Sequence, residues 1–146
     1  ARDGRIPIIL YIGTLADWQG LDVVVKALPK ILEQQTVRLH IIGRGRSRQR
    51  KMLAKQIRKL GIEEHVIVLP AVPHHEIPAV IANADICVAP LGLNDRNVTQ
   101  GACPIKVLEY MAAGRPLLAS NMDSCSHTAQ AGIWESLRCW SMWWLR

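Results

Sequence analysis

Short runs of apolar residues alternate with segments of helical periodicity along most of the chain, and this alternation restricts the fold more than any other feature. A strand that is apolar on both sides has to be covered on both faces, as happens in parallel sheets built from β–α–β units. We therefore predict a Rossmann-like three-layer α/β/α sandwich with a mainly parallel sheet of about five strands. Pro29 falls inside the first helical segment, so we expect a kink or an early end there. The predicted strands are residues 6–12, 37–42, 66–69, 86–89 and 116–120, and the predicted helices are residues 20–34, 47–60, 74–84 and 105–113.

The bulk properties indicate one globular domain of the cytoplasm. The 146 residues are 49% hydrophobic and 21% charged, which suffices for a single sizeable core. No apolar run approaches the roughly 20 residues of a membrane span, and the N-terminus has no signal-peptide pattern. The four cysteines include no C-x-x-C pair, so we expect a reduced protein without a metal site, in which Cys87 is a small core residue.

The alternating pattern breaks down after Asn121. Residues 122–146 hold four of the five tryptophans and two of the four cysteines, and a helix there would be apolar on all sides. We therefore divide the chain into a Rossmann-like domain at 1–121 and an atypical C-terminal tail at 122–146. A truncated or frameshifted end and a native tryptophan-rich contact segment both fit this tail.

Positive charge is concentrated on the second predicted helix and the turn before it. The formal net charge is +6, and residues 44–59 alone carry eight arginines and lysines. A solvated helix face is the plainer interpretation, and contact with an anionic membrane surface or with nucleic acid is the alternative. Nucleic acid is the weaker of these partners, because no aromatic residues are interleaved for base stacking.

Ligands of such folds bind beyond the carboxyl ends of the strands, so the strand-to-helix loops are the candidate site. The first loop runs from Gly13 to Gly20, and it would either cradle a phosphate at the start of the next helix or form a plain β–α turn. The second loop, at 43–46, lacks the third glycine of a G-x-G-x-x-G fingerprint because position 48 is arginine. We predict a simple turn there, and the absence of the fingerprint after the first strand argues against a nicotinamide-dependent enzyme.

The fourth predicted helix carries a cation and a carboxylate close to its start. Lys106 and Glu109 are three residues apart, so they share a helix face near the loop end of the sheet. Such a lysine can hold a phosphate, and such a glutamate can accept two hydrogen bonds from a ribose diol. A surface ion pair of little consequence is the alternative, and spacing alone favours it.

The order and spacing of these segments resemble the C-terminal domain of retaining glycosyltransferases of the group 1 type, which is family 4 with the GT-B fold. The likeness extends over residues 8–121. It is carried by the opening strand, loop and helix at 8–27, the I-I-G-x-G turn at 39–45, the third and fourth strands, and the segment KVLEYMAAGRPLLA at 106–119. No single motif is decisive, but their order and spacing together are specific.

The resemblance implies an enzyme that transfers a sugar from a nucleotide diphosphate sugar with retention of configuration, and that binds this donor on the present domain without a metal or other cofactor. Glu109 matches the second glutamate of the family's E-x7-E motif, which holds the ribose hydroxyls. The backbone at residues 105–107 matches the amides that hold the pyrophosphate, and Val72 matches a position that meets the base. The donor-binding residues suggested in this way, together with the glycine loop, are Gly13, Thr14, Gln19, Val72, Ile105, Lys106, Val107 and Glu109.

The sequence departs from the family pattern where the donor is gripped. The first glutamate of E-x7-E falls at Gly101, and the arginine and lysine that commonly clamp the pyrophosphate fall at Thr14 and Gln19. We expect Lys106 to supply the local cation instead.

The family's N-terminal acceptor domain, and the segment that should follow Asn121, are not recognisable in the chain. We therefore expect the donor-binding domain of a hexosyltransferase, inactive alone, with a nucleotide-sugar donor and an acceptor domain as its partners. The alternative is a non-enzymatic module that uses the basic helix at 46–59 to bind an anionic membrane or nucleic acid. We expect a cytoplasmic location, with peripheral association at the inner membrane surface as a further option.

Overall fold

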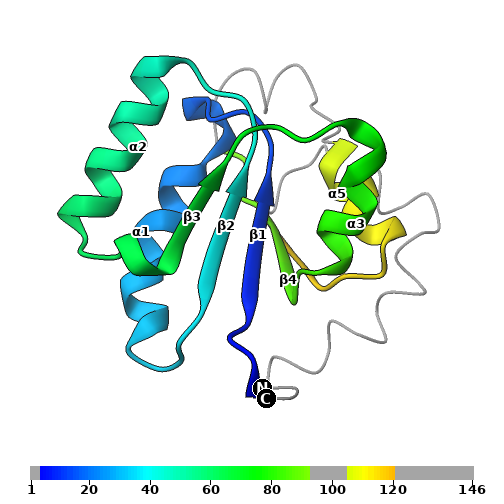
Figure 1. The fold of residues 1–146 in the computed structure, drawn as a ribbon, viewed down its shortest axis with the longest axis horizontal. Helices are drawn as coiled ribbons and strands as arrows, with labels where there is room; N and C mark the ends of the chain where they lie inside the picture. The colour runs from blue at the N-terminus through cyan, green and yellow to red at the C-terminus, as the bar shows by residue number, and fades with distance from the viewer. Residues whose placement is uncertain (1–3, 93–104, 121–146) are drawn as a thin grey trace.

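Five parallel strands form one sheet in the computed structural model, which describes residues 4–92 and 105–120 (Figure 1). The strand order is β3-β2-β1-β4-β5, and every neighbouring pair is parallel. This confirms the predicted Rossmann-like sheet, with strand ends that differ from the predicted ones by at most two residues. The strands are β1 (Ile8–Ile12), β2 (Arg38–Ile42), β3 (Val66–Leu69), β4 (Ile86–Ala89) and β5 (Leu117–Ala119).

Helices cover both faces of the sheet and enclose two separate cores (Figure 1). On one face, α1 and α2 bury Leu28 and Leu53 in a cluster with Leu39 of the sheet. On the other face, α3 and α5 bury Ile81 and Tyr110 in a second cluster. The α-helices are α1 (Leu21–Leu32), α2 (Ser47–Lys59), α3 (Ile77–Ala82) and α5 (Ile105–Ala112), and the 3-10 turns are η2 (Asp17–Gln19), η3 (Glu63–His65) and η4 (His74–Glu76).

Two prolines lie inside helices without ending them. Pro29 does not terminate α1, which continues to Leu32, so an early end at this position does not occur. Because Pro29 sits in the last turn, its missing N–H removes one ladder hydrogen bond, and burial of Leu28 holds the helix on the sheet. Pro78 lies in the first turn of α3, where no intrahelical donor is needed.

The first two strand-to-helix loops are packed tightly together at the carboxyl edge of the sheet. The N–H of Gly13 donates to the carbonyl oxygen of Ile42 at 3.0 Å, and the N–H of Leu15 donates to that of Arg44 at 2.8 Å. A Cβ on Gly43 would lie 1.7 Å from the carbonyl oxygen of Gly13, so only glycine fits at this contact. The segment 43–46 is therefore a short connection braced against the loop that follows β1.

Cys87 is fully buried on β4, which confirms its predicted place in the core. Across residues 4–92 and 105–120, no helix has both the length and the apolarity to cross a membrane, and no cluster of three potential metal-binding side chains occurs. The predicted boundary after Asn121 and the tail at 122–146 lie outside the described residues.

Candidate functional site

The candidate site lies where the loop after β1 meets the start of α5. Lys106, in the first turn of α5, donates a hydrogen bond from Nζ to Oε1 of Gln19 at 2.5 Å. The same Nζ lies 4.6 Å from the centroid of the Tyr11 ring, within range of a cation–π contact. Two predicted site residues that are 87 positions apart in the chain therefore touch in the structure.

Gly13 leaves the space that the lysine occupies. A Cβ at this position would lie 2.7 Å from Nζ of Lys106 and 3.0 Å from the hydroxyl oxygen of Tyr11. Any side chain at residue 13 would therefore push the ammonium group away from the loop. The predicted glycine, glutamine and lysine form one compact group, which we call the lysine site (Gly13, Gln19 and Lys106).

The cation in the lysine site has no charged partner among the residues that the structure describes. Burial lowers the pKa of Lys106 to about 8, so its amine is still mostly protonated at neutral pH. Within the part of the chain that the structure describes, no carboxylate lies within ion-pair distance of Lys106. A desolvated ammonium group without a counter-ion is costly, and a bound anion would relieve that cost.

Two buried tyrosines fix the backbone segments that form the lysine site. The hydroxyl of Tyr11 donates to the carbonyl oxygen of Thr14 at 2.7 Å and so fixes the first loop. The N–H of Ile12 donates to the hydroxyl oxygen of Tyr110 at 2.8 Å, which ties α5 to the end of β1. Burial raises the pKa of both tyrosines, so both hydroxyls stay protonated at neutral pH. Neither tyrosine was among the predicted site residues, although a tyrosine next to a glycine loop in an aliphatic strand was a usable signal.

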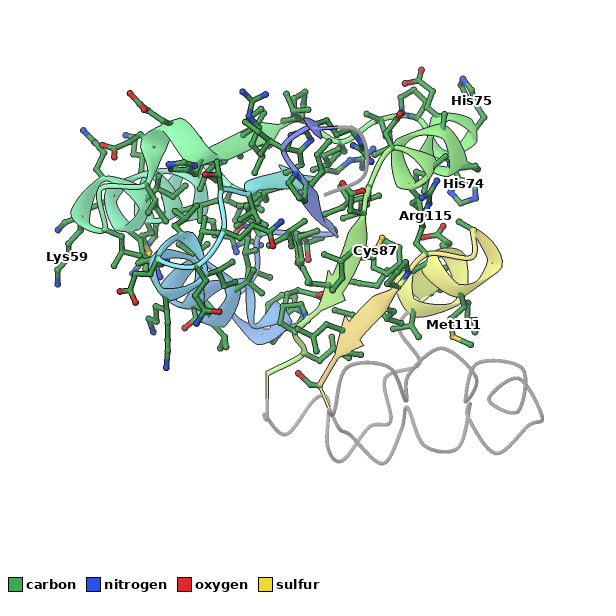
Figure 2. The ribbon with its side chains drawn as sticks, turned by 90° about the horizontal axis from the view of Figure 1, so that it is seen from below. Lys59, His74, His75, Cys87, Met111 and Arg115 are labelled. Atoms are coloured by element: carbon green, nitrogen blue, oxygen red, sulfur yellow. The ribbon has the colours of Figure 1, made fainter. Side chains whose placement is uncertain are left out.

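Glu109 lies one helical turn beyond Lys106 and faces the loop after β3. Its Oε1 is 3.7 Å from Nδ1 of His74, and its side chain is 22% exposed while that of His74 is 86% exposed. Figure 2 shows His74 on the side of the α3 region that faces α5. Lys106 and Glu109 do not pair with each other in the structure. The alternative of a simple surface ion pair between them is therefore wrong. His74 was not among the predicted site residues.

The remaining predicted site residues differ in how far they are exposed. Val72 is half-buried against the second core, and Val107 is buried in it. Ile105 is 69% exposed at the start of α5, and Thr14 is exposed and contributes its carbonyl oxygen to the Tyr11 contact. Gly101, where the resemblance would place a glutamate, lies outside the described residues.

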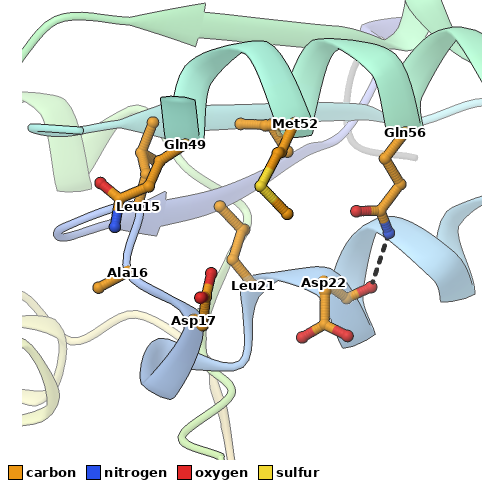
Figure 3. Close-up of a pocket in the computed structure, with 9 residues that line it drawn as sticks. Leu15, Ala16, Asp17, Leu21, Asp22, Gln49, Met52 and Gln56 are labelled. Carbon is orange, nitrogen blue, oxygen red and sulfur yellow. Dashed lines mark hydrogen bonds between the residues drawn. The ribbon is translucent and has the colours of Figure 1, made fainter. Parts of the chain in front are cut away.

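A hollow of about 400 Å³ between α1 and α2, which we call the interhelical hollow, lies next to the first loop (Figure 3). Its described lining contains no cation and two carboxylates, Asp17 and Asp22, and only Asp22 is paired, with Lys26 at 2.9 Å, so the hollow disfavours an anionic ligand. The side-chain amide of Gln56 donates to the carbonyl oxygen of Asp22 at 3.4 Å and links the two helices across it. The lysine site is therefore the better location for a phosphate. The lining residues are Leu15, Ala16, Asp17, Leu21, Asp22, Gln49, Met52, Leu53 and Gln56.

The fold and the lysine site together define a Rossmann-like domain with a cation held at the carboxyl edge of its sheet, where such folds bind ligands. The sequence profile of the glycosyl transferases of group 1 matches residues 6–137. The chain belongs to this family of glycosyltransferases.

Individual relatives agree with this assignment. An uncharacterised glycosyltransferase of Methanocaldococcus jannaschii is 30% identical over 131 residues, which covers 87% of the chain and 31% of that protein. A GDP-mannose-dependent alpha-(1-6)-phosphatidylinositol monomannoside mannosyltransferase of Mycolicibacterium smegmatis is 27% identical over 130 residues, which covers 88% of the chain and 34% of that protein. The chain thus spans about a third of the length of these curated relatives.

A solved structure shows the same fold. The crystal structure of HepE of Anabaena in complex with UDP and glucose superposes with a TM-score of 0.70 at 20% sequence identity, covering 84% of the chain and 31% of that protein. At this identity the likeness shows that the architecture is shared.

Proposed function

We propose that residues 1–121 bind a nucleotide diphosphate sugar, as the donor-binding domain of a glycosyltransferase that transfers the sugar to an acceptor. The observation that carries this proposal is Lys106, a half-buried cation with an amide and a ring as neighbours and no carboxylate partner among the described residues. The names of similar proteins support it: one solved structure holds UDP-glucose, and one relative is named as GDP-mannose-dependent.

The donor diphosphate would bind between the first loop and the start of α5. Its negative charge would lie on the ammonium group of Lys106 and on the backbone amides at residues 105–107, where the helix presents its positive end. Gln19, which now accepts from Lys106, would keep the amine in place while the phosphate binds. The same groups would stabilise the diphosphate as it leaves, so this proposal assigns no role to a metal ion.

The nucleoside would extend from the lysine site towards the loop after β3. Glu109 would accept hydrogen bonds from the ribose hydroxyls, beside His74, whose Nδ1 lies 3.7 Å from Oε1. Val72, at the rim of the second core, would lie against the base. Transfer to an acceptor, with a hexose as the transferred sugar, would further require an acceptor domain, so we propose that the chain alone binds a donor without turning it over.

Calorimetry on the chain with UDP and GDP tests this proposal. We expect binding that weakens about tenfold or more in Lys106→Ala, because a charge-assisted contact with the diphosphate is lost. Glu109→Ala should weaken nucleoside diphosphate binding by a similar factor and leave binding of inorganic pyrophosphate unchanged. Lys55→Ala and Glu33→Ala, which remove exposed charges elsewhere, are matched controls that should bind as the wild type does. Equal affinity in all five proteins, or no binding of either nucleotide, would refute the proposal.

We propose as a second candidate function that α2 contacts an anionic membrane surface. Its exposed side carries five cations, α2 contains no acidic residue, and Leu53 and Ile57 face the core on the opposite side. Figure 2 shows Lys59 pointing away from the body of the protein. The exposed cations of α2 are Arg48, Lys51, Lys55, Arg58 and Lys59.

Co-sedimentation with vesicles separates this candidate from a plain solvated helix. Binding to vesicles containing phosphatidylserine but not to pure phosphatidylcholine, lost in Lys51→Gln/Lys55→Gln, would support it. Equal retention of wild type and variant, or preference for a nucleic acid over the vesicles, would exclude it.

A further inference from the structure

His74 and Glu109 face each other from two elements that are distant in the sequence, the turn η4 and the helix α5. Nδ1 of His74 lies 3.7 Å from Oε1 of Glu109, which is too far for a direct hydrogen bond. Among residues 4–92 and 105–120, neither the ring of His74 nor the carboxylate of Glu109 makes a hydrogen bond with a side chain or with the backbone. The two polar groups are therefore close together, and both can still accept a ligand.

The backbone on both sides of this pair is fixed by the second core. Val72 and Ile77, which flank η4, pack against that core, and Val107 and Tyr110, on either side of Glu109, are buried in it. The turn η4 is closed by a backbone hydrogen bond of 3.0 Å across it. The separation of the two segments is therefore set by packing, and a ligand between them would not have to order the backbone first.

The other cations near Glu109 are held by different partners. The amine of Lys106 donates to Gln19, and the guanidinium group of Arg115 donates to the carbonyl oxygen of Ala82. Among the ion pairs of the described residues, His74 is the one basic group opposite Glu109. Of the described side chains, the ring of His74 is therefore the best placed to share a ligand with this carboxylate.

A hydroxyl group suits the space between an imidazole N–H and a carboxylate. It can donate its proton to the carboxylate oxygen and accept a hydrogen bond from the N–H, so that one ligand atom gives both protein groups a partner. A phosphate or carbonyl oxygen would satisfy the imidazole and leave the carboxylate without a donor, and an N–H group would do the reverse. The His74–Glu109 pair therefore favours a hydroxyl, such as those of a ribose.

We propose that His74 is a second ribose-binding residue, which donates from Nδ1 to the same hydroxyl that donates to Oε1 of Glu109. The pair then distinguishes ribonucleoside diphosphates from their deoxy analogues, because a ligand without this hydroxyl leaves both groups without a partner. This inference rests on the donor-binding function proposed above, since Glu109 meets a ribose only if a nucleotide is the ligand.

Calorimetry of the chain with UDP, 2′-deoxy-UDP, 3′-deoxy-UDP and inorganic pyrophosphate tests the inference, at about pH 7.5, where an ordinary imidazole is uncharged. His74→Ala should weaken UDP binding about three- to tenfold, since one hydrogen bond between uncharged groups is lost, and leave pyrophosphate binding unchanged. With one of the two deoxy ligands, His74→Ala should bind as the wild type does, because the hydroxyl that the ring contacts is already missing. His74→Asn, which keeps an N–H group near the position of Nδ1, should recover part of the lost UDP affinity.

His75→Ala is the matched control, because it removes the neighbouring imidazole from the same turn. The two side chains are similarly exposed, at 86% for His74 and 81% for His75. Nε2 of His75 lies 3.7 Å from Oε1 of Glu76 within η4, and Figure 2 shows His75 on the side of the turn that points away from α5. This variant should bind all four ligands as the wild type does.

The outcomes separate this inference from the donor site. If the wild type binds UDP and His74→Ala binds it equally well, the donor site stands and the role of His74 is refuted. An equal loss of UDP and pyrophosphate affinity in His74→Ala would place the ring at the diphosphate or at the loop, and would also overturn the inference. The same holds if His74→Ala weakens both deoxy ligands by the factor found for UDP. If the wild type binds neither UDP nor GDP, both proposals fail.

Discussion

The lysine site and the second strand-to-helix loop present positive charge at the same edge of the sheet in opposite ways. Lys106 is half-buried, with Gln19, Gly13 and the ring of Tyr11 around its amine. Arg44 and Arg46 are exposed on the second loop and line an open space. The difference teaches that packing can hold a half-buried ammonium group in one position, whereas exposed guanidinium groups stay in contact with solvent. Anion binding at the lysine site should depend on local packing and pH, and anion binding at the two arginines on ionic strength.

Gly43 supports both regions, so its substitution should have the largest effect. In Gly43→Ala the new Cβ would lie 1.7 Å from the carbonyl oxygen of Gly13, which forces the two loops apart. We expect a loss of unfolding free energy of about 3 kcal/mol, and loss of UDP binding. Denaturant unfolding and calorimetry measure the two effects.

Gly61→Ala is the control for this prediction. Gly61 also lies at the end of a secondary-structure element, its φ is +64°, and no atom of the described residues lies within 4 Å of the position that a Cβ would take. The substitution should therefore cost about 1 kcal/mol, from backbone strain alone, and leave binding intact. An equal loss of stability in both variants would mean that the contact between the loops is not what Gly43 provides.

Substitution of Lys106 and of the two arginines should separate the two regions. Lys106→Met should weaken UDP binding about tenfold or more, whereas Arg44→Gln/Arg46→Gln should leave it nearly unchanged. In the wild type, UDP affinity should fall as the pH rises through about 8, where the free amine loses its proton. A pH profile that is the same in wild type and Lys106→Met would show that the amine does not touch the phosphate.

A rise in pH should also change the stability that Lys106 contributes, in the direction opposite to its effect on UDP affinity. The pKa of Lys106 is about 8 in the folded chain, whereas the ordinary value for a solvated lysine is 10.5, so the folded state loses this proton first as the pH rises. The unfolded state then binds more protons between these values, and the unfolding free energy contributed by Lys106 rises over this interval. The difference in unfolding free energy between wild type and Lys106→Met should therefore shift in favour of the wild type from pH 8 to 10.5, as urea titrations can measure. A constant difference would contradict the burial of the amine.

Two substitutions of Tyr11 separate the contribution of its hydroxyl from that of its ring. Tyr11→Phe keeps the ring beneath Lys106 and removes the hydrogen bond to the carbonyl oxygen of Thr14, so we expect a loss of about 1 kcal/mol in stability. Tyr11→Leu also removes the ring and should weaken UDP binding further, by a few-fold. If both variants bind UDP equally, the ring contributes nothing to the position of the amine.

The sequence was sufficient for the fold but only partly for the site. Apolar strands and helix periodicity predicted all five strands, because burial on both faces leaves a clear pattern. Spacing alone favoured a trivial Lys106–Glu109 pair, whereas the fold places Lys106 on Gln19 and Glu109 near His74. Contacts across 87 positions depend on how loops meet in three dimensions, and no local pattern encodes them. The role of Tyr110 on α5 was missed for the same reason, whereas Tyr11 had a usable local signal in its place beside the glycine loop.

Ionic strength should have the smallest effect and should distinguish the two regions once more. Raising salt from about 0.05 to 0.5 M should weaken anion binding that depends on Arg44 and Arg46 several-fold, because exposed charges are screened. UDP binding at the half-buried lysine site should change less over the same range. A several-fold loss of UDP affinity, measured by calorimetry, would mean that UDP binds through exposed charge.

A crystal structure of the chain with UDP bound tests the central claim most directly. We predict a phosphate oxygen within hydrogen-bonding distance of Nζ of Lys106, with Gln19 still beside the amine and the ribose hydroxyls on Glu109. A diphosphate bound to Arg44 and Arg46, with Lys106 unchanged on Gln19 and no phosphate near it, would contradict the donor-site assignment.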